Sequence, residues 1–411
     1  MRIGIYYHAQ IDRKTGGDAA FQEIIVDEIR RIGRRHEVYL FSPSQPVDPY
    51  VEQEGIRFIK LDADTQSTGK TGEVTKVMKR LISYGADWLL DREFTHFSSL
   101  EKAVLEHKID LVWFVAIWTE KVTVPYIATV WDLAHRTHPY FPEVSVTGWK
   151  WKLRERLYRE LLPRAACVIT GTEVGKEEII RYYQLPEHLV QVVPFPTPQF
   201  ALVPPEARDK AIVTESFPEN YLFYPAQFWP HKNHIGLLLA LKTVREEYSI
   251  DLNLVLTGSD KGNLGYVQEM VEKLGLTGKV SFLGFVETGL LRELYRRAFA
   301  LVYPTFFGPD NLPPLEAFAL GCPVIASKVN GAEEQLGNAA LLFDPKDPIA
   351  MARRIQELHD SPDKREELIN LGRKRALRWT AADYVEQMFH IIDDFEPIRR
   401  CWSSSKPYRQ K

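Results

Sequence analysis

Apolar runs of strand length alternate with amphipathic helical patterns along this chain of 411 residues, and this alternation limits its fold more than any other feature. In the first half, we predict a helix over residues 19–33 and strands over 2–7, 37–41, 111–114, 126–131 and 167–171. In the second half, we predict helices over 235–248, 264–274 and 290–298, and strands over 221–225, 253–257, 280–283, 299–305 and 324–327. The pattern is typical of α/β proteins with doubly wound parallel sheets, which bind ligands beyond the carboxyl ends of their strands.

A proline-rich stretch from Val193 to Pro205 separates the two halves. A chain of this length is also too long for one ordinary hydrophobic core, which favours two domains. We therefore place the joint there, with one Rossmann-like domain over residues 1–200 and a second over 201–380.

Composition and charge exclude several classes of function. The formal net charge of −3 argues against nucleic acid as a partner. Cys167, Cys322 and Cys401 are too few and too widely spaced for a disulfide framework or a zinc site, which favours a reducing, cytoplasmic compartment. The first apolar run is too short for a signal peptide, and no stretch reaches the roughly 20 apolar residues of a membrane span. Gly-x-Gly-x-x-Gly is absent after the first predicted strand, which argues against a nicotinamide or flavin enzyme.

The strongest functional signal is the segment from Phe307 to Ile325, Phe-Gly-Pro-Asp-Asn-Leu-Pro-Pro-Leu-Glu-Ala-Phe-Ala-Leu-Gly-Cys-Pro-Val-Ile. Its two prolines suit the start of a helix, which would place Glu316 in the first helical turn. Backbone N–H groups and the positive end of the helix dipole suit a diphosphate, and a neighbouring carboxylate can accept hydrogen bonds from ribose hydroxyls. We predict donor contacts from Asp310, Asn311, Leu312 and Glu316. In the alternative interpretation, Glu316 only balances the helix dipole.

This segment resembles the donor-binding motif of the family 4 retaining glycosyltransferases, also called glycosyl transferases group 1. In that family two glutamates eight positions apart bracket the loop; Glu316 matches the second, whereas Gly308 stands at the first. The resemblance implies the GT-B architecture, in which two Rossmann-like domains face a cleft and a carboxyl-terminal helix, here within about 381–411, packs back on the first domain.

A second part of the donor site is expected after the first strand of the second domain. Lys232 and Asn233 resemble the family's Lys-Asn pair, in which basic side chains hold the diphosphate, and Gln227 stands where the family has arginine. An amide in place of a guanidinium leaves Lys232 with most of the leaving-group charge. Gly284 is expected to let the nucleotide base approach the backbone. The alternative interpretation makes Asn233 a helix N-cap and Lys232 a solvated surface residue.

In the first domain, Gly16 and Gly17 lie between the first strand and the first helix, where the backbone can approach phosphate, although a plain turn explains them equally well. Asp132 and His135 follow the strand over 126–131 and are candidates for catalysis or acceptor contact; Trp131 occupies a position where family members often carry histidine. A packed or capping histidine is the alternative for His135.

The sequence thus predicts a retaining, metal-independent hexosyltransferase that uses a nucleoside diphosphate sugar and acts on a glycan or lipid-linked acceptor in polysaccharide synthesis. No Asp-x-Asp motif stands at a strand end, so no metal or other cofactor is expected. The basic, leucine-striped segment over 149–162 suggests either peripheral contact with the inner face of a membrane or an ordinary domain helix. A same-fold epimerase or hydrolase and a non-catalytic nucleotide-sugar-binding protein remain alternatives.

Overall fold

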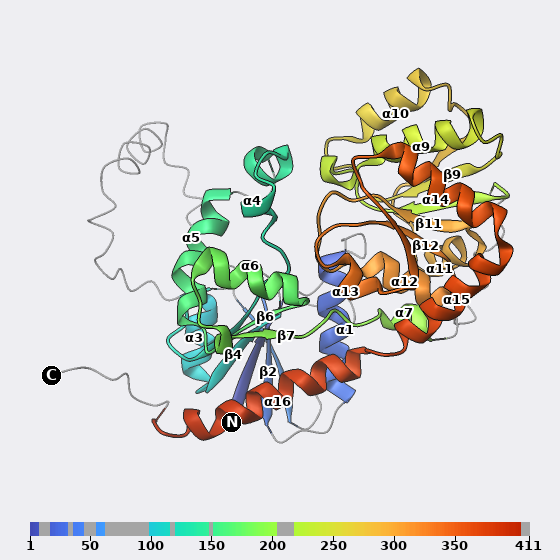
Figure 1. Cartoon of the computed structure of the whole chain (residues 1–411). Helices are drawn as coiled ribbons and strands as arrows, with labels where there is room; N and C mark the ends of the chain where they lie inside the picture. Colours follow the sequence, from blue (N-terminus) through green and yellow to red (C-terminus); the bar gives the residue numbers. More distant parts are fainter. Residues whose placement is uncertain are drawn as a thin grey trace, which may run out of the picture.

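A computed structural model describes residues 1–7, 17–31, 36–44, 55–61, 98–115, 120–147, 151–203 and 218–403. Within these ranges the chain forms two separate β-sheets flanked by helices, arranged as two lobes (Figure 1). The predicted architecture of two Rossmann-like α/β domains is confirmed. None of the helices in the described ranges is long and apolar enough to cross a membrane.

The first sheet has seven strands in the order β3-β2-β1-β4-β5-β6-β7, and each is parallel to its neighbours. Its strand order reverses between β1 and β4, which makes the carboxyl ends of these strands a switch point. The strands are β1 (Arg2–Tyr6), β2 (Glu37–Ser42), β3 (Ile56–Lys60), β4 (Leu111–Phe114), β5 (Tyr126–Thr129), β6 (Cys167–Thr170) and β7 (Val190–Val192).

Helices cover both faces of this sheet because side chains alternate along each strand. Ile3 and Ile5 pack with the helices α1 and α16, whereas Tyr6 packs with α3, α5 and α6 on the other face. The helical segments of this lobe are α1 (Gly17–Arg31), α3 (Ser99–Glu106), α4 (Ala134–Thr137), a π-helical turn η1 (Glu143–Thr147), α5 (Trp151–Leu161), η2 (Leu162–Arg164), α6 (Glu173–Tyr183) and η3 (Glu187–Leu189).

The second sheet has six parallel strands in the order β10-β9-β8-β11-β12-β13, with its switch point between β8 and β11. The strands are β8 (Tyr221–Pro225), β9 (Asn253–Thr257), β10 (Val280–Phe282), β11 (Ala300–Tyr303), β12 (Val324–Ser327) and β13 (Ala340–Phe343). The helical segments are η4 (Pro230–Lys232), α9 (His234–Glu246), α10 (Leu264–Lys273), α11 (Thr288–Arg297), α12 (Leu312–Leu320), α13 (Ala332–Leu336), α14 (Pro348–Asp360) and α15 (Pro362–Ala376).

The chain crosses between the lobes twice, and hydrogen bonds join the two crossings. After β7 it passes through residues 194–198 to the short helix α7 (Gln199–Leu202), and it returns after α15 at Trp379. The backbone N–H of Thr197 donates to the carbonyl of Trp379 (3.2 Å), and the indole N–H of Trp379 donates to the carbonyl of Pro194 (2.7 Å). The domain limits at residues 200 and 380 stay predictions.

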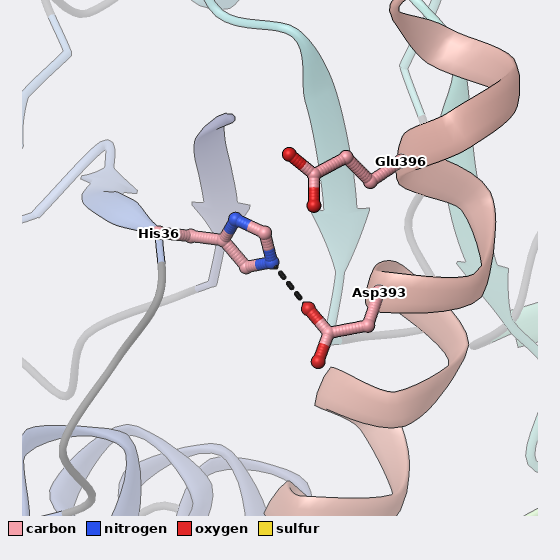
Figure 2. A group of neighbouring side chains, drawn as sticks. All are labelled: His36, Asp393 and Glu396. Carbon is pink, nitrogen blue, oxygen red and sulfur yellow. Dashed lines mark hydrogen bonds and ion pairs between the residues drawn. The ribbon is translucent and has the colours of Figure 1, made fainter.

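The last described helix, α16 (Ala381–Arg399), lies against the first lobe and packs on α1 (Figure 1). Figure 2 shows one attachment: His36 Nε2 lies 2.7 Å from Asp393 Oδ1, with Glu396 beside them. The amino nitrogen of Met1 lies 3.2 Å from Nδ1 of the same ring, so both ring nitrogens have partners. The three side chains are close enough together to hold a cation, but their existing contacts explain the cluster as an attachment of α16.

Arg399 makes a second attachment and provides a test of it. Its guanidinium is 3% exposed, contacts the carboxylate of Asp110 (2.9 Å) and donates to the Asp110 carbonyl (2.9 Å). Arg399→Ala should lower the free energy of unfolding by about 1–3 kcal/mol, because the Asp110 carboxylate loses its charged partner and the Asp110 carbonyl loses its donor. Arg400→Ala, at the exposed neighbouring position, should change it by less than about 0.5 kcal/mol. Equal effects of the two variants in chemical denaturation would contradict this role.

Candidate active site

A cavity of about 390 Å³ lies between the two lobes. Apart from Glu178, which lies in the middle of α6, the lining residues belong to segments that follow a strand at the carboxyl edge of its sheet. The first lobe contributes Asp132, Leu133, Ala134, Thr137, His138 and Glu178, and the second contributes residues 306–309, 328–330 and 344–346. Carboxylates, lysines and aromatic rings therefore share one partly open cavity, as expected for a polar ligand with flat faces.

Asp132 lines the cavity, and contacts with α4 and α5 hold its carboxylate in place. Its Oδ1 accepts a hydrogen bond from the backbone of Ala134 (2.8 Å), at the start of α4. The buried guanidinium of Arg154, on α5, lies 3.2 Å from the same oxygen and also donates to the Asp132 carbonyl (2.5 Å). These contacts fix the direction of the carboxylate, so Asp132 can orient a ligand.

His135 faces the interior of the first lobe. Its ring is fully buried, and Nε2 lies 3.2 Å from Glu155 Oε2 and 3.1 Å from the Tyr183 hydroxyl. Burial lowers the pKa of His135 to about 4. His135 does not line the cavity, so its geometry matches the alternative of a packed histidine.

His138, three residues further along the chain, does line the cavity. Its ring centroid lies 5.2 Å from that of Phe307, which belongs to the loop after β11. Burial, and then the nearby charge of Lys346, lower the pKa of His138, so the neutral ring is favoured. This ring can therefore accept or donate a hydrogen bond to a neutral ligand.

Lys232 and Asn311 meet at the switch point of the second sheet. Lys232 ends η4, which follows β8, and its Nζ donates to the Tyr303 hydroxyl (3.1 Å). That hydroxyl in turn donates to Oδ1 of Asn311, the residue before α12 (3.0 Å). A cation and a helix N-terminus thus lie at the place where open α/β sheets bind ligands.

Asn233 uses its whole side chain to hold the backbone. It is 7% exposed and has a left-handed backbone (φ 55°), and its Oδ1 accepts from the backbone of Gly236 to cap α9 (3.1 Å). Its Nδ2 donates to the carbonyls of Pro304 (3.0 Å) and Pro345 (2.9 Å). The N-cap interpretation is therefore confirmed for Asn233.

Gln227 and Gly284 lie in the loops after β8 and β10. The Gln227 amide is engaged by Trp229, which donates to its Oε1 (3.0 Å), and by Ser259, which accepts from its Nε2 (3.2 Å). Gly284 has φ 64° and leaves open space where a side chain would stand. Gly17 begins α1, and Gly16 lies outside the described residues.

Glu316 is not in the first helical turn, so that prediction is wrong. The helix α12 begins at Leu312, before the two prolines, which makes Glu316 its fifth residue. The Tyr295 hydroxyl, on α11, donates to Glu316 Oε2 (2.6 Å). Burial raises the pKa of Glu316 to about 7, although the Tyr295 hydrogen bond acts in the opposite direction.

Two of the predicted donor residues contact the first lobe. Asp310 accepts from the backbone N–H of Phe195 (2.9 Å) and from the Gln335 amide, and burial raises its pKa to about 7. Leu312 is 8% exposed and packs in the same apolar cluster as the first sheet and α16. These contacts place Asp310 and Leu312 at the boundary between the lobes.

The departures from the family pattern have structural reasons. Gly308 has φ 124°, and a Cβ there would lie 2.8 Å from the Asn311 side chain, so a glutamate does not fit this loop conformation. Trp131 packs edge-on against Phe21 and Phe195, with centroids 5.5 and 5.8 Å apart, and does not line the cavity.

Sequence reasoning missed several cavity residues. Glu178, on α6, is 9% exposed, and burial raises the pKa of its carboxyl. Other examples are Thr137, His138, Lys328, Asn330, Asp344 and Lys346. For these residues the signal is their position after the strands β5, β12 and β13, because every parallel strand ends at the ligand-binding edge of its sheet. Glu178 lies in the middle of α6 and has no such local signal.

Comparisons with known proteins agree with this geometry. Residues 24–196 match the glycosyl transferase 4-like domain, and residues 206–375 match the glycosyl transferases group 1. The O-antigen chain mannosyltransferase RfbU of Salmonella typhimurium is 24% identical over 315 residues, which make up 76% of this chain and 80% of that protein.

Two solved structures share the fold at low identity. Sucrose-phosphate synthase from Thermosynechococcus elongatus has a TM-score of 0.72 at 19% identity, over 97% of this chain and 99% of that chain. HepE of Anabaena, solved in complex with UDP and glucose, has a TM-score of 0.65 at 16% identity, over 96% of this chain and 100% of that chain. The two family matches and the shared fold lead to one conclusion: this chain belongs to the family 4, group 1 glycosyltransferases and is a glycosyltransferase of the GT-B fold.

Proposed function

We propose that this glycosyltransferase moves a hexose, with retention, from a nucleoside diphosphate sugar to an acceptor hydroxyl on a glycan or lipid-linked glycan. The observation that carries the proposal is the contact of Lys232 and Asn311 through Tyr303 at the switch point of the second sheet. In this arrangement residues 201–380 form the donor domain and residues 1–200, with the segment 381–411, form the acceptor domain. The names of RfbU, an O-antigen mannosyltransferase, and of HepE with UDP support a polysaccharide acceptor and a nucleotide donor.

The donor half of the reaction depends on charge. As the sugar–phosphate bond breaks, negative charge grows on the departing diphosphate, and an interaction that strengthens at that moment lowers the barrier. Lys232 and the N-terminal end of α12 supply positive charge there without a metal ion. Glu316 holds the ribose hydroxyls, Gln227 adds hydrogen bonds to the phosphates, and Gly284 leaves room for the base.

The acceptor half is proposed to bind in the cavity between the lobes. Asp132 orients the acceptor hydroxyl, and His138 takes the role in acceptor contact that the sequence predicts for His135. The half-buried ring of Phe306 offers an apolar surface to a sugar face, while the carboxylate of Glu178 accepts hydrogen bonds from hydroxyls. Sugars are recognised by this combination of planar apolar and hydrogen-bonding groups.

A lipid-linked acceptor would bring the protein to the inner face of a membrane. Helix α5 turns Arg154 and Glu155 inward and leaves Lys152, Arg156 and Arg159 exposed. We propose that this basic outer face makes the peripheral contact with anionic headgroups, which attract such clusters.

A panel of nucleotide sugars, each incubated with and without a mixture of oligosaccharide and lipid-linked acceptors, tests the function. We expect nucleotide release that depends on the acceptor and that persists in EDTA. Free sugar without acceptor would indicate hydrolysis, and a new nucleotide sugar would indicate epimerisation. Loss of transfer in EDTA with recovery in Mg²⁺ would contradict the metal-independent mechanism, and binding without turnover would favour a non-catalytic protein.

Removal of the two donor side chains tests the assignment of the donor site. Lys232→Ala should lower kcat about 10²–10³-fold, because the leaving diphosphate loses its cation. Glu316→Ala should raise the donor KM in a protein that still folds, although its melting temperature should fall because the Tyr295 hydroxyl loses its acceptor. Lys273→Ala, which removes an exposed lysine from α10, is the matched control and should leave the kinetics unchanged. If both site variants keep full activity, the donor site lies elsewhere.

The raised pKa of Glu316 predicts the pH dependence of donor use. Ribose hydroxyls donate best to an ionised carboxylate, and burial shifts its ionisation to about pH 7. Since kcat/KM reports the free enzyme, its value for the donor should rise between about pH 6 and 8. Glu316→Gln should remove this rise, whereas Asp310→Asn, at a carboxyl whose pKa is also about 7, should keep it. A rise that survives in Glu316→Gln would assign the titration to another group.

A further inference from the structure

Glu143 and His231 join the two lobes beside the proposed donor site. Glu143, 1% exposed, begins the π-helical turn η1 of the first lobe, and His231, 3% exposed, lies in η4 of the second. The Oε1 atom of Glu143 accepts from the backbone N–H of His231 (2.9 Å) and lies 2.6 Å from Nδ1 of its ring. One carboxylate oxygen of the first lobe therefore holds both the backbone and the side chain of His231.

The protonation states agree with this geometry. Burial favours the neutral carboxyl, but the hydrogen bonds from His231 outweigh it and hold the pKa of Glu143 below its usual range. Burial lowers the pKa of His231 to about 4. Because an ionised carboxylate only accepts hydrogen bonds, the neutral ring carries its proton on Nδ1.

His231 is also bound to the loop after β11 and is next to Lys232. Its carbonyl accepts from the backbone N–H of Phe306 (2.9 Å), and its ring stacks on Phe307 with centroids 4.2 Å apart and planes 15° apart. A shift of His231 therefore moves both the turn that carries Lys232 and the aromatic wall of the cavity.

The surrounding contact is apolar and crosses between the lobes. Ala134, Phe141 and Val144 of the first lobe pack against Phe306 and Phe307 of the second. Among the described residues, the other oxygen of Glu143, Oε2, is buried without a hydrogen-bond partner. A buried oxygen without a donor makes the closed contact less favourable than full pairing would, which suits a contact that opens and closes.

We propose that Glu143 is a positioning residue: it latches the acceptor lobe onto η4 when the cleft closes and, through His231, holds the Lys232 ammonium in place for the leaving diphosphate. The role of Lys232 in this proposal rests on the proposed function. The latch between Glu143 and His231 does not, because it requires only that the two lobes close. The coupling makes leaving-group stabilisation depend on closure, and closure excludes water that would otherwise hydrolyse the donor.

Kinetics with the nucleotide sugar that the panel identifies test the positioning role. Glu143→Ala should lower kcat about 10- to 100-fold, in the range expected for a misplaced catalytic group, with a smaller change in the dissociation constant for UDP or GDP. His231→Phe keeps a ring to stack on Phe307 but lacks the Nδ1 donor, and should also lower kcat. The double variant should be no worse than the poorer single variant, because both changes break one contact. Glu177→Ala removes an exposed carboxylate from α6 and is the matched control.

Small-angle X-ray scattering tests the latch without any activity. Glu143→Ala should have a larger radius of gyration than the wild type, both alone and with UDP or GDP. Should Glu143→Ala fail to fold, Glu143→Gln keeps the size and one acceptor oxygen, and should give an intermediate loss of kcat and an intermediate radius.

Equal radii for wild type and variant, or additive effects of the two single substitutions on kcat, would overturn the latch. If the wild type transfers no sugar but Glu143→Ala still has the larger radius of gyration, the proposed function is wrong and the latch is supported.

Discussion

Parallel pairing of all the strands within each sheet is the constraint on which the rest of the molecule depends. Because neighbouring strands run the same way, each one delivers its following loop to the same edge, where backbone groups and helix N-termini are available to a ligand. The cavity is lined by such segments: Asp132 follows β5, Phe307 follows β11, and Lys346 follows β13. The two loop-bearing edges face one another, so polar residues distant in sequence meet in one space.

The central strands could be predicted from the sequence, and the two edge strands of the first sheet could not. Leu111–Phe114, Tyr221–Pro225 and Asn253–Thr257 are near-continuous apolar runs, because helices bury both of their faces, and their bounds match the prediction. The edge strand β3 contains Arg57 and Lys60 and is half-exposed, and β7 has three residues. Edge strands need less apolar surface, so their pattern is weaker and both were missed.

Sequence also predicted which loops carry polar residues, but not the direction of each side chain. His135 and His138 lie three residues apart in the same segment, yet one is fully buried in the lobe and the other lines the cavity. Asn233 lies in the expected loop, but its side-chain amide makes three hydrogen bonds to the backbone and is not directed at a ligand. Side-chain direction depends on backbone angles and on partners from distant elements, such as Pro345 for Asn233, which a local pattern does not contain.

The two crossings between the lobes, near Thr197 and Trp379, are hydrogen-bonded to one another. A single linker would allow one lobe to rotate and twist freely relative to the other. Two hydrogen-bonded segments that cross side by side resist twisting. Such a pair of crossings favours a hinge rotation about an axis along them, which opens and closes the side of the cleft that lies opposite the crossings. Asp310 binds Phe195 close to these crossings, whereas Glu143 lies in the turn after α4, on the side of the first lobe away from α7 (Figure 1), where it contacts His231. A small change in the angle between the lobes therefore separates Glu143 from His231 more than it separates Asp310 from Phe195. The lobes can open at the first contact while the second stays formed.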